Sequence, residues 1–508
     1  MWTRQTLTGV VLGLLSAALV TWLVGSVILP APAPVTAATS AMTITLTVVV
    51  ILALWTGADT AHRRWGHRPL VAHGLRILAL QVAATLPLAA QLRGTGRYLN
   101  GTQGDQSFRL ALAEKYSAYW TPVDTYFSDL PSYYPGLWFW GLGRLSAVTG
   151  YEVIDLYAFY NLATMAVAVT VNYLLWIAAR VERPGIHALT TAVVGTAFAA
   201  YEPYSWVLLA QSLPLILLLF RVLDDHHTHT HTHTRRQLIV VGLLAGLIAG
   251  VALSMYTLAA LFAALVVVIA LLLHHGRIHW RSAAVVTAVG AVAAAVIAAP
   301  WWWGFLTYDG AGAGHGNAAA GYNPMVGASL ATALQQPVPW MMLAAAGLVA
   351  IALLHDRHPV MKAAFVAVAA VAAWYVLSAV VHLATDPTLL AFRGIPVLFL
   401  ALAAAAVHGA GTLPAAVGQA RVDAGRHAAA ETGPGAGSRW SVPAVITAII
   451  GTVLLQAVPG ELATEIEGAK ASAGAGHTRE VVRCLQEGTG DDDLAGLTVA
   501  STDMLLAA

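Results

Sequence analysis

Long apolar runs separated by short polar segments recur along almost the whole chain. About 20 apolar residues suffice for a helix to cross the roughly 30 Å hydrocarbon core of a bilayer, and this pattern predicts thirteen spans. The predicted spans are Thr8–Leu29, Met42–Trp55, Gly74–Leu92, Leu156–Ala178, Ala188–Ala200, Trp206–Leu223, Leu238–Leu253, Leu258–Leu273, Ala283–Trp302, Trp340–Leu354, Ala363–Val381, Ile395–Leu413 and Val442–Val458. We therefore expect an all-α polytopic membrane protein.

One long segment interrupts the pattern between the third and fourth predicted spans. Residues 93–155 are too polar to cross a bilayer and too rich in Tyr and Trp for a disordered spacer. They contain six acidic side chains and five basic ones, which are Arg93, Arg97, Arg109, Lys115 and Arg144. Loops held by a rigid scaffold commonly carry binding and catalytic residues, so we expect the functional site here.

Both ends of the chain depart from the repeating pattern. The first apolar run is open to two readings, a cleaved signal peptide or a retained span; its length favours the span, because signal peptides have apolar regions of about 7–15 residues. Residues 460–508 are polar, and we expect them to open an extracytoplasmic α/β domain of which this sequence carries only a part. About 50 residues make too small a core alone. The predicted domains are thus 1–459 and 460–508.

The distribution of Arg and Lys predicts the orientation. With the N-terminus in the cytoplasm, the inside loops hold seventeen of these residues and the outside membrane loops hold six. Cytoplasmic loops are enriched in positive charge. Residues 93–155 are therefore predicted to lie on the extracytoplasmic face of the plasma membrane.

Composition excludes several classes of protein. Of the 508 residues, 58% are hydrophobic and 10% are charged, against about 25% charged in soluble domains. The net charge of +1 and the lack of a basic cluster argue against a nucleic-acid partner. The single cysteine, Cys484, excludes an internal disulfide and a multi-cysteine metal site.

A cytoplasmic loop after the sixth predicted span reads DDHHTHTHTHTRR, residues 224–236. Alternating His and Thr permits two readings, a metal-binding tract or a low-complexity solvated loop. We favour the solvated loop, because no Cys or additional carboxylate completes a shaped site. No metal site or cofactor is predicted elsewhere in the chain.

Ionisable and polar groups at the external rim of the membrane are the candidates for chemistry, because burying them is costly unless they are used or paired. Asp105 follows the turn NGTQG and begins the helical stretch DQSFRLALAEKY. Its carboxylate is suited to act as a general base towards a hydroxyl. Arg393, and with it Arg109, are candidates to bind a phosphate. Further substrate-binding candidates are Gln106, Tyr133, Tyr134, Glu202 and His382.

Each of these groups also has a purely structural reading. Asp105 could cap a helix beginning at Gln106, and Glu202 could pair with Arg109. Tyr133 and Tyr134 could pack a short helix on the membrane surface. The remaining loop carboxylates and aromatics, Asp124, Asp129 and Trp301–Trp303, read more simply as solvated residues and an interfacial belt.

The stretches GDQSFRLALAEKYS (104–117) and DTYFSDLPSYYPGLWFWGLGRLSAVTG (124–150), with AFRGIP around Arg393, carry a family resemblance. They resemble the actinobacterial arabinofuranosyltransferases, above all the galactan 5-O-arabinofuranosyltransferase (AftA) type. That family belongs to the GT-C glycosyltransferases, which have many spans, a catalytic Asp in an external loop near the N-terminus, and a soluble C-terminal domain. The Asp of the GDQ motif corresponds to Asp105.

The resemblance implies transfer of arabinofuranosyl residues from decaprenyl phosphoarabinose to cell-wall galactan, by an inverting displacement with Asp105 as base. Two other readings stay open. One keeps the GT-C enzyme but uses another polyprenyl phosphosugar, such as phosphomannose. The other is a lipid-linked sugar transporter; it is disfavoured because the predicted spans are nearly free of charge.

Overall fold

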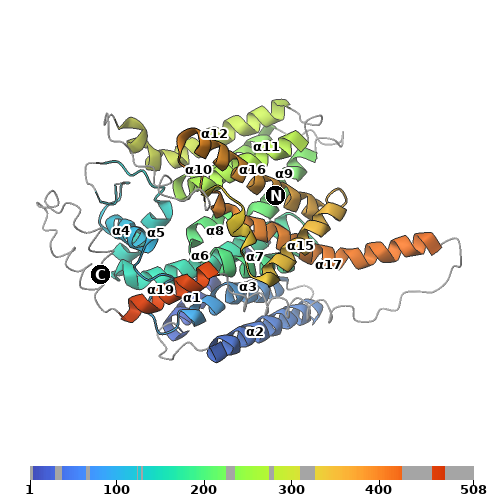
Figure 1. The fold of residues 1–508 in the computed structure, drawn as a ribbon, viewed down its shortest axis with the longest axis horizontal. Coiled ribbons are helices and arrows are strands. Elements are labelled where there is room, and N and C mark those ends of the chain that lie inside the picture. Colours follow the sequence, from blue (N-terminus) through green and yellow to red (C-terminus); the bar gives the residue numbers. More distant parts are fainter. Residues whose placement is uncertain are drawn as a thin grey trace, which may run out of the picture.

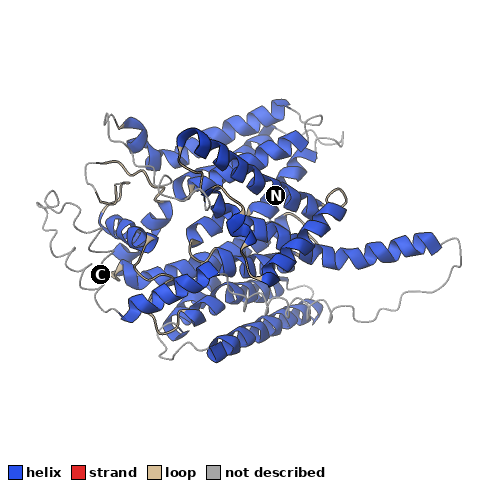
Figure 2. Ribbon diagram, viewed as in Figure 1, coloured by secondary structure: helices blue, strands red, loops and turns tan. Residues whose placement is uncertain are grey.

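The computed structural model describes residues 4–28, 37–64, 69–122, 124–126, 130–224, 235–273, 280–308, 327–425 and 460–474. Within these ranges the fold is helical throughout and contains no strand (Figures 1 and 2). The helices are α1 (Arg4–Leu23), η1 (Val24–Ile28), α2 (Ala37–Arg64), α3 (Pro69–Gln91), α4 (Asp105–Ala118), α5 (Leu137–Thr149), α6 (Val153–Ala178), α7 (Pro184–Phe198), α8 (Pro203–Leu209), α9 (Ser212–Asp224), α10 (Arg235–Met255), α11 (Thr257–Leu273), α12 (Trp280–Thr307), α14 (Ala331–Leu334), α15 (Val338–Leu354), α16 (Pro359–Thr385), η4 (Ala391–Gly394), α17 (Ile395–Gly425) and α19 (Gly460–Gly474).

Eight segments of the described chain are long and apolar enough to cross a membrane, and three shorter apolar helices accompany them. Eleven of the predicted spans coincide with these segments. The predicted span Ala188–Ala200 falls on α7, a helix of 15 residues outside both groups, and Val442–Val458 lies outside the described residues. The helical membrane character is confirmed, whereas the number of thirteen spans stays a prediction. The strand expected in the C-terminal region also lies outside the described residues; the described part of that region is α19.

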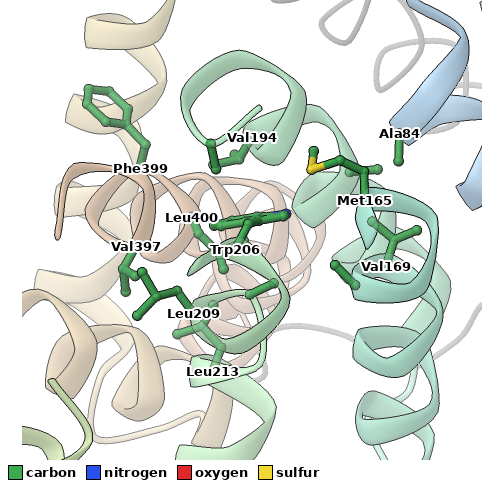
Figure 3. Packing of buried hydrophobic residues seen from close by; sticks show 14 of the residues in the cluster. Ala84, Met165, Val169, Val194, Trp206, Leu209, Leu213, Val397, Phe399 and Leu400 are labelled. Atoms are coloured by element: carbon green, nitrogen blue, oxygen red, sulfur yellow. The ribbon is translucent and has the colours of Figure 1, made fainter. Parts of the chain in front are cut away.

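The core is centred on Trp206 of α8, which is fully buried. Figure 3 shows its indole lying among apolar side chains of α3, α6, α7, α9 and α17. Gly195 of α7 makes room for the ring, because a Cβ there would lie 2.3 Å from the indole Nε1 of Trp206. Since α8 begins directly after Glu202, this packing fixes the place of that carboxylate.

The predicted span Trp206–Leu223 is broken into two helices, α8 and α9. At the break, Asn172 Nδ2 donates a hydrogen bond to Ala210 O at 2.6 Å, and Gln211 Nε2 donates to Ala168 O at 3.0 Å. A carbonyl freed from the helical ladder needs a partner in an apolar environment. The buried amide of Asn172 on α6 therefore satisfies the Ala210 carbonyl at the interruption, and the Gln211 side chain ties the break to α6.

Residues 93–155 form two helices, α4 and α5, that pack closely on one side of the bundle (Figure 1). Gly143 of α5 lies against α4, since a Cβ there would meet Ala113 O at 2.5 Å. Arg144 Nε donates to Tyr116 O at 2.8 Å, near the C-terminal end of α4. A cation that binds the last carbonyls of a helix also opposes its dipole. These contacts hold α4 as a rigid element.

Candidate active site

Asp105 is the first residue of α4, which confirms the predicted helix start. The residue before it, Gly104, has φ of +56°, a conformation that favours glycine, and it serves as the N-cap without a side-chain bond. The reading of Asp105 as a cap for a helix starting at Gln106 is therefore wrong. Because its side chain is 47% exposed and is not needed as a cap, the carboxylate is available to a ligand.

The turn before Asp105 is fixed on two sides. The buried Tyr98 donates its hydroxyl to Ala200 O at 2.6 Å. On the other side, Asn100 N donates to Glu465 O of α19 at 2.7 Å. A Cβ at Gly468 would lie only 2.2 Å from Asn100 Oδ1, so α19 packs directly on the turn. The segment after the predicted spans thus contributes to placing Asp105.

Glu202 lies at the centre of a cluster of four charged residues. Its Oε1 accepts hydrogen bonds from Arg109 Nη2 at 2.7 Å, from Arg393 Nη1, and from the Tyr204 hydroxyl at 3.1 Å. Asp105 Oδ2 lies 3.5 Å from Arg109 Nη2 and 3.8 Å from Arg393 Nη2. The predicted pairing of Glu202 with Arg109 is confirmed.

Arg109 is the most deeply buried member of this charge cluster, with a side chain 3% exposed. Its Nη1 donates to Tyr201 O at 2.9 Å, and its guanidinium lies 4.4 Å from the centroid of the Tyr201 ring. Burial lowers the pKa of Arg109, but the acidic groups around it, Tyr204 and Glu202 first among them, outweigh burial and leave it well above its ordinary value. Arg109 therefore carries a permanent positive charge.

Arg393 reaches the cluster from a distant part of the sequence, on the short helix η4 just before α17. The chain leading to it is anchored: Trp374 Nε1 donates to Leu389 O and Leu389 N donates to Ser378 Oγ, both at 2.9 Å. The side chain of Arg393 is 16% exposed. It is more accessible than Arg109 and so better placed to meet an anionic ligand.

The charges of the cluster cancel, because two arginines face two carboxylates. The arrangement offers a half-exposed carboxylate, which can accept a proton, within 4 Å of guanidinium groups that can stabilise an anion. Such a pair suits a reaction in which a hydroxyl loses a proton while a phosphate leaves. Among the described residues, no group of three or more His, Cys, Asp or Glu is arranged to hold a metal ion.

Buried hydroxyl and amide groups surround the cluster. The Tyr134 hydroxyl lies 3.2 Å from that of Tyr204, and burial raises the pKa of Tyr134, which favours its neutral form. Gln106 is fully buried; its Oε1 accepts a hydrogen bond from the Tyr157 hydroxyl, while its Nε2 has no hydrogen-bond partner among the described residues. Gln106 and Tyr134 thus lie in the polar region around the charge cluster.

The other predicted residues have different surroundings. Tyr133 is 47% exposed. His382 Nδ1 bonds to Asp386 O at the end of α16, and its role towards a substrate stays a prediction. Asp124, expected to be solvated, is 3% exposed and accepts from Tyr126 N at 2.9 Å; that expectation is wrong, because the carboxylate stabilises a turn. Asp129 lies outside the described residues.

Sequence reasoning did not assign a role to three tyrosines of the site, Tyr157, Tyr201 and Tyr204. Two of them flank Glu202 in the stretch YEPYSW. The available signal for these tyrosines was Glu202, a carboxylate that lies between two of them just before a predicted span. Which side of the helix each ring faces is decided only by the packing around Trp206.

Comparison with known proteins agrees with the family resemblance of the sequence. A family described as arabinofuranosyltransferase N-terminal matches residues 5–433. A galactan 5-O-arabinofuranosyltransferase of Mycolicibacterium smegmatis is 28% identical over 202 residues, which cover 40% of this chain and 31% of that protein. Proteins of the same name from Mycobacterium tuberculosis and Corynebacterium glutamicum are 30% and 31% identical over 189 and 135 residues. These matches cover 37% and 26% of this chain, and 28% and 20% of the relatives. The chain therefore aligns with less than a third of the length of each of these relatives. Because the family match covers residues 5–433, the chain belongs to the arabinofuranosyltransferase N-terminal family.

Proposed function

We propose that this protein is a GT-C glycosyltransferase that moves an arabinofuranosyl residue from decaprenyl phosphoarabinose to cell-wall galactan. The observation that carries the proposal is the half-exposed carboxylate of Asp105 within 4 Å of Arg109 and Arg393. The names of the relatives support the sugar and the acceptor. We place the site on the extracytoplasmic face of the plasma membrane, where the orientation rule and the family expectation agree.

The reaction is a single displacement with inversion at the anomeric carbon. A galactan hydroxyl forms the new bond to that carbon while Asp105 takes its proton. The bond from the anomeric carbon to the phosphate oxygen breaks, and its electron pair stays on the polyprenyl phosphate. Arg393 and Arg109 offset the charge that develops on this leaving group. Asp105 and the arginines thus act on opposite ends of the reacting system.

The test is a transfer assay with purified Asp105→Asn protein. Asn keeps the size of the side chain but cannot accept the proton, so we expect turnover to fall roughly 10²–10⁴-fold with the lipid donor still bound. Glu152→Gln, an exposed carboxylate at the end of the same loop, is the matched control and should remain active. Near-normal transfer by folded Asp105→Asn protein would refute the general-base role.

Running the same assay with polyprenyl phosphoarabinose and polyprenyl phosphomannose, each on a galactan acceptor, tests the donor. We expect transfer from the arabinose donor. Transfer from the mannose donor alone would keep the enzyme class and overturn the proposed sugar. No transfer from either donor by the full-length protein would contradict the transferase proposal.

A further inference from the structure

Tyr256 stands at the junction between α10 and α11, beside the charge cluster. Its backbone N–H donates to Ala252 O at 2.7 Å, and its side chain is buried. The ring contacts that of Tyr204 edge-on, with the centroids 5.7 Å apart. Because the Tyr204 hydroxyl donates to Glu202 Oε1 at 3.1 Å, Tyr256 packs against a residue that bonds the centre of the cluster.

The hydroxyl of Tyr256 has no hydrogen-bond partner among the described residues. The neighbouring tyrosine hydroxyls differ, since those of Tyr98, Tyr134 and Tyr204 all lie within 3.2 Å of a protein oxygen. A buried donor left unsatisfied costs roughly 1–3 kcal/mol. Phe would fill the same space without this cost, so a ligand group that accepts a hydrogen bond from this hydroxyl would offset it.

The charges around Tyr256 indicate what kind of partner fits. Burial raises the pKa of the Tyr256 phenol, Glu202 raises it further, and Arg393 lowers it, leaving the pKa well above its ordinary value. The phenol is therefore neutral and protonated at physiological pH and acts as a hydrogen-bond donor. Arg393 is one of the two arginines at which the donor phosphate is proposed to bind, so the phenol lies near that part of the cluster.

The charge cluster by itself has no excess positive charge to balance a phosphate. The positive charges of Arg109 and Arg393 are already matched by Glu202 and Asp105. A phosphodiester brings one further negative charge, and bond cleavage turns it into a monoester that carries nearly two. Neutral donors that point at the developing charge stabilise it without the repulsion or the desolvation that extra ions would bring.

We propose that the Tyr256 hydroxyl donates a hydrogen bond to the phosphate of the polyprenyl phosphosugar and stabilises it as it leaves. This inference rests on the proposed function and adds a catalytic residue to it. In the transition state the electron pair of the breaking carbon–oxygen bond moves onto the phosphate oxygen, and Tyr256 keeps its proton throughout. The only proton that is transferred passes from the acceptor hydroxyl to Asp105.

Tyr256→Phe tests this directly, because it removes one oxygen atom that no described protein group binds. We expect the melting temperature to stay at or above that of the unsubstituted protein. We expect turnover to fall about 10–100-fold, somewhat less than the loss seen when a donor is removed from an oxyanion hole. Inhibition by free polyprenyl phosphate, the leaving group itself, should weaken by about tenfold.

Tyr116→Phe is the matched control. Tyr116 is a buried tyrosine of α4 whose ring contacts that of Trp301 edge-on, with the centroids 6.2 Å apart. Within the described part of the chain, no hydrogen bond, ion pair or ring contact joins it to the charge cluster. This variant should keep normal turnover and normal inhibition.

Three outcomes separate the possibilities. Tyr256→Phe protein with normal turnover and normal inhibition by polyprenyl phosphate overturns the inference and leaves a bridging solvent molecule as the partner of the hydroxyl. Weaker inhibition with lower turnover supports it. If the unsubstituted protein transfers no sugar, the proposed function fails, but polyprenyl phosphate binding measured by thermal shift still decides whether Tyr256 contacts a lipid phosphate.

Discussion

Glu202→Gln is the substitution that probes the charge cluster most directly. The Glu202 side chain is 8% exposed and those of Arg109 and Arg393 are 3% and 16% exposed. Gln keeps the volume and one acceptor oxygen, so the bond from Tyr204 survives. It removes the negative charge that both guanidinium groups share. The cluster then changes from neutral to a net charge of +1.

The expected loss of stability follows from this geometry. Removing one partner of a buried ion pair costs about 3–5 kcal/mol, because the remaining charge is left uncompensated. Since Gln still accepts a hydrogen bond and Arg393 retains some access to solvent, we expect the lower end, roughly 3 kcal/mol. The same excess positive charge should favour a phosphate ligand, which would partly restore the balance.

The assay is thermal unfolding of purified Glu202→Gln protein with and without polyprenyl phosphate. We expect a clearly lower melting temperature without ligand and a larger ligand-induced rise than in the unsubstituted protein, because a ligand that binds the folded state more tightly stabilises it more. Glu467→Gln is the control, since the Glu467 side chain is 71% exposed and pairs with Lys470 one turn along α19, at 2.6 Å. A Glu202→Gln protein that melts at the normal temperature would refute the idea that Glu202 compensates both arginines.

Three further predictions concern Arg393, the contact of α19 with the Asn100 turn, and the orientation of the chain in the membrane. Arg393→Ala should weaken binding of the polyprenyl phosphosugar by roughly 1.5–3 kcal/mol, and Arg393→Lys should restore only part of it because Lys lacks the planar fork; unchanged donor affinity in Arg393→Ala would remove this residue from the site. Gly468→Val should displace the Asn100 turn, since even a Cβ at Gly468 would lie 3.2 Å from Asn100 Cα, and we expect a lower kcat with donor affinity retained. The control, Ala471→Val on the exposed face of α19, should have no effect. Equal rates for the two variants would show that α19 does not position Asp105. Cys484 should react with an impermeant thiol reagent in intact cells; labelling only after the cells are opened would reverse the predicted orientation.

The sequence by itself determined the helical membrane character, and it singled out the segment that holds the candidate site. Runs of about 20 apolar residues can satisfy their backbone groups in a bilayer only as helices, so length and hydropathy were sufficient. The Gly-rich turn before Asp105 likewise predicted the start of α4 correctly, because left-handed backbone conformations are encoded locally by glycine. The polar, aromatic composition of residues 93–155 marked this segment as the candidate for function, and that role stays a prediction.

Only the tertiary structure decided which charged groups meet. Asp105 and Arg109 lie one helical turn apart, but Glu202 and Arg393 come from distant segments, and their approach depends on the packing of Trp206 and on the anchored turn before η4. The break between α8 and α9 has a signal in the sequence, because Gln211, Ser212 and Pro214 interrupt the apolar run Trp206–Leu223. The partner of the Ala210 carbonyl at this break, Asn172 of α6, was decided only by the tertiary structure. Periodicity reports which side of a helix is apolar, but not which helix lies against it. That choice comes from side-chain volume and from hydrogen bonds between segments far apart in the chain, and at this site it determines which charges are paired and leaves Asp105 half exposed.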